Sequence, residues 1–170
     1  MQNRLGELEL ADIHTILDAL GKRGVIDVAR VGCYGGSYGG FLTLMALFTE
    51  PGKWKCGAAL RSVSDWRSYH PSYTQPRLGR PSKNDEVYKR CCPIDLAEGL
   101  RDPLLILHGM EDSNVFAQDS IRLIEKLIDL GKDFEAMLYP SQDHAFTDGR
   151  HWVDEYRRIE RWMHVHLGEP

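Results

Sequence analysis

A glycine-rich turn, residues 35–40 (GGSYGG), joins a β-rich run to a long apolar run in this sequence. The run before the turn, residues 28–34, predicts a strand, and the run after it, residues 38–48, predicts a buried helix because it is apolar nearly all round. Glycines on both sides allow the strand and the helix to pack closely, and the serine between them is held in a strained conformation with its hydroxyl exposed. The turn therefore places Ser37 where a strand ends and a helix begins.

The turn matches the pattern G-x-S-x-G, whose serine acts as a nucleophile when a strand precedes it and a helix follows it. Two other interpretations are an incidental serine in a glycine-rich turn and a phosphate-binding loop. The dinucleotide-binding and P-loop patterns both fail, since no Lys-Ser or Lys-Thr pair follows. Ser37 is therefore the candidate nucleophile.

Strand-like and helix-like segments alternate along the chain. Apolar side chains at helical spacing predict helices over residues 7–20, 117–130 and 153–167. Further strands are predicted over residues 55–60, 103–109 and 134–139. Residues 62–93 form a longer irregular connection in which we expect short helices, in particular around residues 85–90. This alternation predicts a single α/β domain, with a mainly parallel sheet flanked by helices.

Charge and hydropathy argue against several classes of function. The 21 Lys and Arg residues against 25 Asp and Glu give a net charge of −4, so the positive excess that binds nucleic acid is lacking. No apolar stretch approaches the ~20 residues of a membrane span, and the start of the chain leads into no signal-peptide core. We therefore expect no nucleic-acid partner, no membrane partner and a cytoplasmic location.

The cysteines have neither the spacing of a zinc site nor that of a disulfide framework. They are Cys33, Cys56, Cys91 and Cys92. We expect them to be small, reduced core residues, which fits a reducing compartment.

A serine nucleophile needs an imidazole that takes its proton and a carboxylate that fixes the imidazole tautomer. Both partners should lie at the carboxyl ends of later strands. Glu111 and Asp112 follow the strand predicted over residues 103–109, and spacing does not separate them. Asp102 precedes the same strand and is at the wrong end.

Of the seven histidines, His144 has the required position, because it follows the strand predicted over residues 134–139. His151 lies slightly further on and is the rival. The other five lie on helices, in the irregular connection or within a strand: His14, His70, His108, His164 and His166. The order Ser, Asp, His is that of the α/β-hydrolase fold.

Residues 30–40, 103–115 and 139–144 together resemble the catalytic domain of the prolyl oligopeptidase family of serine peptidases. The second segment has the form H-G-x-x-D-x-x-V, and the similarity is greatest to the dipeptidyl-peptidase and acylaminoacyl-peptidase branches. The resemblance extends over essentially the whole chain. It implies an α/β-hydrolase fold and a catalytic triad of Ser37, Asp112 and His144.

The same resemblance gives a meaning to the irregular connection. Residues 63–74 are similar to the segment that, in dipeptidyl peptidases, lines the pocket for the residue before the scissile bond. The implied pocket residues are Trp66, Tyr69, Tyr73, Asn114 and Val115. Aromatic walls offer a flat apolar slot for a small ring or alkyl side chain. The alternative is that these aromatic residues simply pack on the domain surface.

The oxyanion of a tetrahedral intermediate needs two donors, and the backbone N–H of Tyr38 is one. In the resembled family the second comes from a tyrosine ahead of the region where this sequence begins, and several strands and a β-propeller also precede that region. The resemblance thus implies that residues 1–170 are an incomplete hydrolase domain. Loss of one donor typically costs about 10² to 10³ in kcat, so we expect weak activity unless another group substitutes.

An incomplete sheet also has consequences for association. The strand predicted over residues 28–34 would lie at an open edge, which presents unpaired backbone groups to a partner. We expect a homo-oligomer that forms through this strand or through the helix over residues 7–20.

These observations together predict a serine hydrolase that cleaves peptide or other acyl bonds through an acyl-enzyme. One alternative is a carboxylesterase on small acyl esters, and another is a weakly active or inactive fragment whose main property is association. The expected ligand is a peptide or small acyl substrate. Nothing in the sequence requires a cofactor or a metal.

Overall fold

A computed structural model describes residues 2–168 and contains one sheet of four parallel strands. The strands are β1 (Cys33–Gly36), β2 (Gly57–Leu60), β3 (Leu104–Gly109) and β4 (Glu135–Tyr139). They lie side by side in chain order, and each neighbouring pair is parallel. The predicted α/β class with a parallel sheet is therefore confirmed, and all four carboxyl ends meet at one edge of the sheet.

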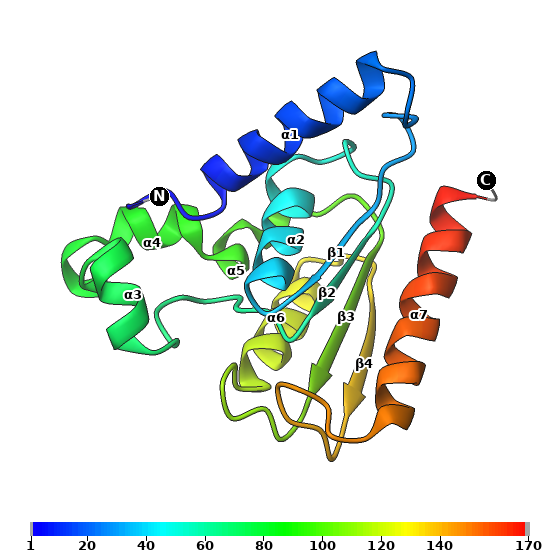
Figure 1. Cartoon of the computed structure of the whole chain (residues 1–170). Coiled ribbons are helices and arrows are strands. Elements are labelled where there is room, and N and C mark those ends of the chain that lie inside the picture. The colour runs from blue at the N-terminus through cyan, green and yellow to red at the C-terminus, as the bar shows by residue number, and fades with distance from the viewer. Residues whose placement is uncertain (1, 169–170) are drawn as a thin grey trace.

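Helices cover both faces of the sheet (Figure 1). They are α1 (Glu7–Lys22), α2 (Tyr38–Thr49), α3 (Pro71–Leu78), α4 (Asp85–Cys91), α5 (Pro93–Leu96), α6 (Gln118–Asp129) and α7 (Gly149–Leu167), with short 3₁₀ turns at Pro81–Lys83 and Ala97–Gly99. α7 covers one face and packs on a small apolar cluster around Leu107 and Tyr139. The other helices lie on the opposite side, over a larger core around α2.

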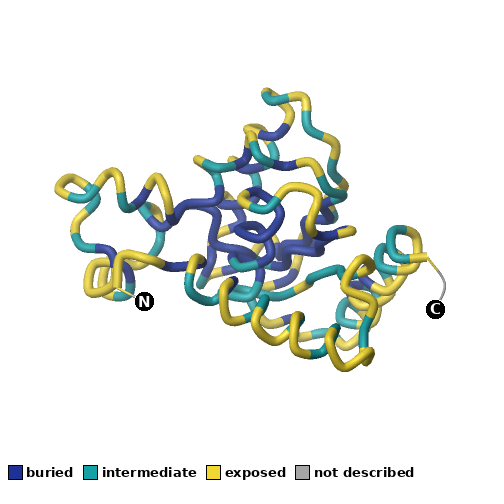
Figure 2. Tube along the Cα trace, turned by 90° about the horizontal axis from the view of Figure 1, so that it is seen from above, coloured by how far each residue is buried: buried dark blue, intermediate teal, exposed yellow. Residues whose placement is uncertain are grey.

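The buried residues concentrate on the two central strands, β2 and β3, and on α2, whereas the outer helices alternate between buried and exposed faces (Figure 2). α2 is buried almost all round, as its apolar sequence predicted. Glycine makes the close approach possible, because a Cβ on Gly40 would lie 2.6 Å from the carbonyl oxygen of Leu60. A Cβ on Gly35 would lie equally close, at 2.6 Å, to the backbone of Gly39. These contacts fix the position of the strand-to-helix turn.

The first strand begins later than its sequence predicted. Residues 28–30 form a turn, in which the side chain of Asp27 accepts a hydrogen bond from the backbone N–H of Ala29 at 2.9 Å. The backbone carbonyl of Asp27 accepts another from the N–H of Arg30 at 3.0 Å. An aspartate that bonds its own backbone two residues on favours a turn over a strand. The β-branched residues Val28 and Val31 suggested a strand that begins at residue 28, and this prediction was wrong, because β1 begins at Cys33.

The last helix begins earlier than predicted, at Gly149 rather than at residue 153. Asp148 caps it, because its side chain accepts a hydrogen bond from the N–H of Arg150 at 2.8 Å. Residues 62–93 contain the expected short helices, including one at Asp85–Cys91.

All four cysteines are free thiols, and burial raises the pKa of Cys33 to about 12 and that of Cys56 to about 11. Among the described helices, none is long and apolar enough to cross a bilayer.

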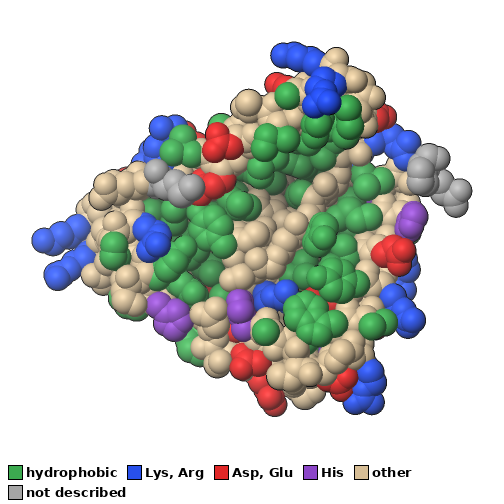
Figure 3. Space-filling model, viewed as in Figure 1, with side chains coloured by type: hydrophobic (Ala, Val, Ile, Leu, Met, Phe, Trp, Pro, Cys, Tyr) green, Lys and Arg blue, Asp and Glu red, His purple; other side chains and the backbone are tan. Residues whose placement is uncertain are grey.

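β1 lies at an edge of the sheet with part of its backbone unpaired. The N–H of Cys33 donates to the carbonyl of Cys56, just before β2, at 3.0 Å, and the N–H of Ser37 donates to Leu60 in β2 at 2.9 Å. In a parallel ladder alternate residues face the same neighbour, so Tyr34 and Gly36 direct their backbone groups away from β2. Figure 3 shows apolar side chains, in green, gathered on both sides of a tan band of backbone and other side chains.

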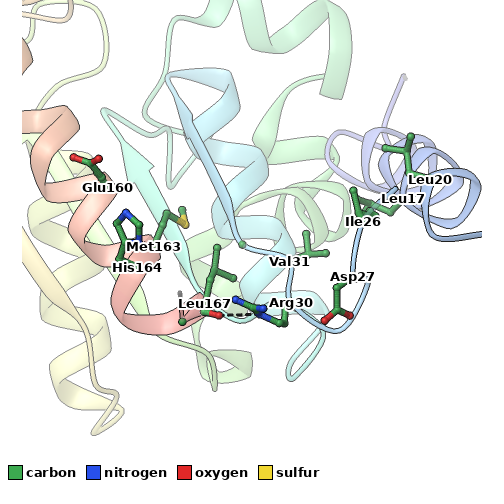
Figure 4. A pocket seen from close by; sticks show the side chains of 12 residues that line it. Leu17, Leu20, Ile26, Asp27, Arg30, Val31, Glu160, Met163, His164 and Leu167 are labelled. Atoms are coloured by element: carbon green, nitrogen blue, oxygen red, sulfur yellow. Dashed lines mark hydrogen bonds between the residues drawn. The ribbon is translucent and has the colours of Figure 1, made fainter. Parts of the chain in front are cut away.

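Two apolar hollows flank this edge. One, of about 660 Å³, lies between α1, the segment before β1 and the end of α7 (Figure 4). Its wall includes Leu17, Val31 and Met163, and Arg30 closes one side by donating to the backbone carbonyl of Leu167 at 2.9 Å. The other, of about 480 Å³, lies between Tyr34 and α7. Apolar hollows on both sides of an open strand edge favour pairing with a further strand.

We expect a second copy of the chain to occupy this edge at high protein concentration, and Tyr34→Lys to weaken the association. A lysine on an edge strand opposes strand pairing, and Tyr34 is 59% exposed on β1. Sedimentation velocity over a concentration series measures the effect. Ile128→Lys is the control, since Ile128 is also 59% exposed but lies on α6. A monomer at all concentrations would contradict the prediction.

Candidate active site

Ser37 occupies the turn between β1 and α2 in a strained backbone conformation, with φ 58° and ψ −117°. A non-glycine residue with positive φ costs of the order of 1–3 kcal/mol, so the surrounding structure must hold it. Two hydrogen bonds do so. The Ser37 N–H donates to Leu60 at 2.9 Å, and its carbonyl accepts from Phe41 at 3.0 Å. The backbone at Ser37 is thus tied to β2 and to the first turn of α2.

Asp112 follows β3 and is buried, and its carboxylate accepts three hydrogen bonds and also contacts a second histidine. One oxygen accepts from the backbone N–H groups of Asn114 and Val115, at 2.9 and 2.8 Å. The other accepts from His144 Nδ1 at 2.7 Å and lies 3.2 Å from His108 Nε2. Burial alone would raise the pKa of Asp112, but these hydrogen bonds outweigh it and hold the pKa well below its usual range. Asp112 is therefore an anion fixed in place.

His108 is a site residue that the sequence reasoning missed, because it was assigned only to its strand. Its side chain is fully buried. Its Nε2 faces two acceptors, the Val115 carbonyl at 2.9 Å and the Asp112 carboxylate, so Nε2 carries the proton. Its Nδ1 therefore accepts from the Ser120 hydroxyl at 2.7 Å. In the sequence, Asp112 follows His108 by four residues, and this short spacing could have indicated that the two side chains meet.

His144 lies in the loop that follows β4, and its side chain is 22% exposed. Because the Asp112 carboxylate can only accept, His144 donates through Nδ1–H, which leaves Nε2 as the basic nitrogen. The preceding residue anchors the loop. Asp143 accepts from the backbone N–H groups of Ser113 and His144, at 2.9 and 2.7 Å. The bond from Ser113 contributes most to lowering the pKa of Asp143, and the bond from His144 contributes next. Together they join the loops after β3 and β4.

The structure separates the candidates that spacing left open. Glu111 is exposed, and no contact recorded among the described residues joins its carboxylate to a histidine. Asp102 lies at the amino end of β3 and accepts from the backbone of Gly52 at 2.8 Å. His151 lies on α7 with its Nδ1 3.8 Å from Asp148. The geometry thus brings together Asp112 and His144.

No hydrogen bond between Ser37 Oγ and His144 is recorded within residues 2–168. Ser37 lies at the carboxyl end of β1, and His144 follows the carboxyl end of β4, so both belong to the same edge of the sheet. In ligand-free active sites, hydrogen bonds between nucleophile and base are often long and shorten when substrate binds.

The predicted pocket residues form one aromatic cluster. Tyr73 stacks on Trp66 with ring centres 5.8 Å apart, and Tyr69 meets the same indole edge-on at 5.6 Å. The Tyr69 hydroxyl donates to Asn114 at 3.0 Å. Trp66 and Val115 are 1% and 0% exposed and belong to the core, so Tyr69 and Tyr73 supply the accessible surface. The cluster links the irregular connection to the loop that carries Asp112.

The Tyr38 side chain has a partner that the sequence did not reveal. Its hydroxyl donates to the Glu9 carboxylate on α1, and burial together with this bond raises the pKa of Tyr38. Glu9 also accepts from the backbone N–H of Gly6 at 3.1 Å. The backbone N–H of Tyr38 belongs to the first turn of α2, where N–H groups have no partner within the helix. Within residues 2–168 no hydrogen bond from that N–H is recorded, so it can donate to a group bound next to Ser37.

The lowered pKa of Asp112 predicts a pH dependence of stability. An ionised carboxylate with a depressed folded-state pKa stabilises the fold above the unfolded-state value of about 4, and this contribution disappears as the pH falls towards the folded-state pKa. Asp112→Asn should therefore lose less stability than wild type between about pH 6 and about pH 3. Urea unfolding across this range measures the free energy of unfolding at each pH. If this free energy fell equally with pH in the two proteins, Asp112 would not be the carboxylate with the lowered pKa.

Comparisons with known proteins identify the family of this chain. The model of the prolyl oligopeptidase family matches residues 1–170. The chain is 36% identical over 152 residues to dipeptidyl peptidase 4 of Felis catus, covering 88% of this chain and 20% of that protein. It is 36% identical over 163 residues to prolyl endopeptidase FAP of Mus musculus, covering 94% and 21%. The chain thus spans about a fifth of the length of these relatives.

Solved structures give the same result for the fold. Dipeptidyl peptidase 4 of Porphyromonas gingivalis superposes with a TM-score of 0.90 at 32% identity, covering 97% of this chain and 24% of that one. A putative dipeptidyl aminopeptidase IV from Bacteroides ovatus superposes with a TM-score of 0.92 at 28% identity, covering 97% and 23%. The α/β-hydrolase fold inferred from the order of the motifs is confirmed.

Proposed function

This chain belongs to the prolyl oligopeptidase family of serine peptidases, and from that premise we propose that it cleaves peptide bonds with Ser37 as nucleophile, His144 as base and Asp112 as the orienting carboxylate. The observation that carries the proposal is the 2.7 Å hydrogen bond from His144 Nδ1 to Asp112, which leaves Nε2 free to accept a proton. The half-buried serine in a strained strand-to-helix turn at the same edge of the sheet supports it.

The reaction follows from these positions. Ser37 Oγ attacks the acyl carbon while its proton passes to His144 Nε2, and a tetrahedral intermediate forms. The Tyr38 N–H donates to the developing oxyanion. The intermediate collapses, the bond to the amine breaks, and the amine leaves with the proton from His144. A water molecule, deprotonated by His144, then hydrolyses the acyl-enzyme, and Ser37 recovers its proton as the carboxylic acid leaves.

The ionised Asp112 has two roles in these steps. It keeps the proton of neutral His144 on Nδ1, and it stabilises the imidazolium after proton transfer. The hydrogen bonds from Asn114 and Val115 and the contact with His108 hold the carboxylate so that it need not reorganise during the reaction.

The aromatic cluster suggests the class of substrate. Tyr69 and Tyr73 present flat, largely apolar surface beside the loop of Asp112, which suits a small ring or a short alkyl side chain. Two relatives are named dipeptidyl peptidase 4 and prolyl endopeptidase FAP. We therefore propose peptides with a small apolar or proline-like residue before the scissile bond as substrates.

Two measurements test the proposal. A fluorophosphonate should label the protein, and mass spectrometry should locate the adduct on Ser37. Then kcat/KM should be compared for an aminoacyl-prolyl anilide and a short-chain nitrophenyl ester. Labelling with anilide cleavage supports a peptidase, whereas cleavage of the ester alone replaces this assignment by a carboxylesterase, since an ester has the easier leaving group. Folded protein that is not labelled refutes the catalytic assignment.

A further inference from the structure

Arg61, the first residue after β2, has a backbone conformation unusual for its type, with φ 41°. Its N–H donates to the carbonyl of Leu107 at 2.7 Å, which extends the pairing of β2 with β3. Positive φ at a bulky residue is strained and persists only where the surrounding structure enforces it. The side chain is 14% exposed, so a guanidinium is held mostly within the protein at the carboxyl edge of the sheet.

Four groups surround this guanidinium. Glu155 on α7, with a side chain 1% exposed, forms an ion pair with it at 3.2 Å. The guanidinium carbon lies 5.1 Å from the ring centre of Trp152 and 5.8 Å from that of Phe146. On the side of the nucleophile, a Cβ on Gly36 would lie 3.0 Å from its nitrogen. The Arg61 side chain thus lies between the end of β1 and the segment after His144.

The aromatic partners connect Arg61 to the histidine loop. Phe146 is two residues after His144, and its carbonyl accepts from Trp152 Nε1 at 2.7 Å. The Phe146 and Trp152 rings also contact each other, with centres 5.2 Å apart. The loop is therefore held at both sides of His144, by Asp143 on one and by Phe146 on the other.

We propose that the Arg61–Glu155 ion pair is a positioning device that sets the distance between Ser37 and His144. It rests on the proposed function, because it acts on that same site. One side of the guanidinium lies next to Gly36, the last residue of β1 before Ser37, and another side packs on the rings that follow His144. An arginine suits this position because its planar group stacks on aromatic rings while it bonds a carboxylate.

The test uses the full chain and four variants. Arg61→Met, Glu155→Gln and the double variant Arg61→Met/Glu155→Leu remove the pair, and Arg61→Lys keeps the charge without the planar group. A displacement near 1 Å can cost about 10²-fold in rate, so we expect kcat and the rate of fluorophosphonate labelling to fall by about 10- to 100-fold, with KM unchanged. Arg61→Lys should have a kcat above that of Arg61→Met but below that of the wild type.

The double variant separates positioning from folding. Replacing both members of a buried ion pair by apolar residues is often neutral for stability, so this variant should melt like wild type while kcat stays low. Arg158→Met is the matched control on α7. It also removes an arginine from an ion pair, because Arg158 pairs with Asp154 one helical turn before it. It should leave kcat unchanged.

Three outcomes would overturn the proposal: a double variant with normal kcat, Arg61→Lys at full activity, or a rise in KM with normal kcat, which would make Arg61 a substrate contact. Wild-type protein that is not labelled would instead refute the proposed function.

Discussion

Ser37→Ala should abolish fluorophosphonate labelling and lower kcat by about 10⁵- to 10⁶-fold. The alanine has no hydroxyl to form the acyl-enzyme, and the remaining groups can only assist direct attack by water. The fold should be unchanged, because the bonds that hold this turn come from the Ser37 backbone and not from its side chain. Active-site labelling and steady-state hydrolysis of an aminoacyl-prolyl anilide measure the two effects.

Ser72→Ala is the control for this change. Ser72 lies on α3, is exposed and makes no side-chain hydrogen bond recorded among the described residues. It should be labelled at the wild-type rate. If Ser37→Ala were still labelled on another serine with hydrolysis intact, Ser37 would not be the nucleophile, and the role of the glycine-rich turn would have to be structural.

Asp112→Asn should lower kcat by about 10⁴-fold while the protein remains folded. The asparagine amide would face His144 Nδ1 with a donor or a weaker, neutral acceptor, so the ring would no longer be held with its proton on Nδ1. His144 Nε2 would then be unable to accept the proton of Ser37. The neutral amide would also fail to stabilise the imidazolium that forms during the reaction.

Asp102→Asn provides the matched control, because it makes the same substitution at the opposite end of the same strand. Its amide oxygen can still accept from Gly52, so we expect wild-type kcat. A small effect of Asp112→Asn, together with a large effect of Glu111→Gln, would transfer the orienting role to Glu111. Single-turnover measurements of acylation would then show which carboxylate acts on the chemical step.

Much of the fold could be predicted from the sequence because the governing signals are local. The glycines of the turn at residues 35–40, the apolar run at β3 and the helical spacing in α1 and α6 each act over a few neighbouring residues. Parallel order followed from the alternation of strand and helix. The ends were less certain, because the Asp27 turn and the Asp148 cap shifted β1 and α7 away from the predicted boundaries.

The site was only partly predictable. Ser37, Asp112 and His144 could be named because catalytic side chains follow the carboxyl ends of strands in a parallel sheet. His108 was missed because its role comes from a buried turn that places its ring against Asp112. The choice between Asp112 and Glu111 followed from a resemblance, whereas the structure distinguishes them by burial, by three hydrogen bonds to Asp112 and by its contact with His108.

The sequence alone determined the order of strands and helices, the sharp turn at Ser37 and the family, since these depend on side-chain periodicity and backbone preferences that each segment carries with it. Only the tertiary structure decided which side chains meet across long separations, as Arg61 and Glu155 do over 94 positions. The reason is that a buried charge can be accommodated only beside its partner, and packing of the whole chain brings the two together.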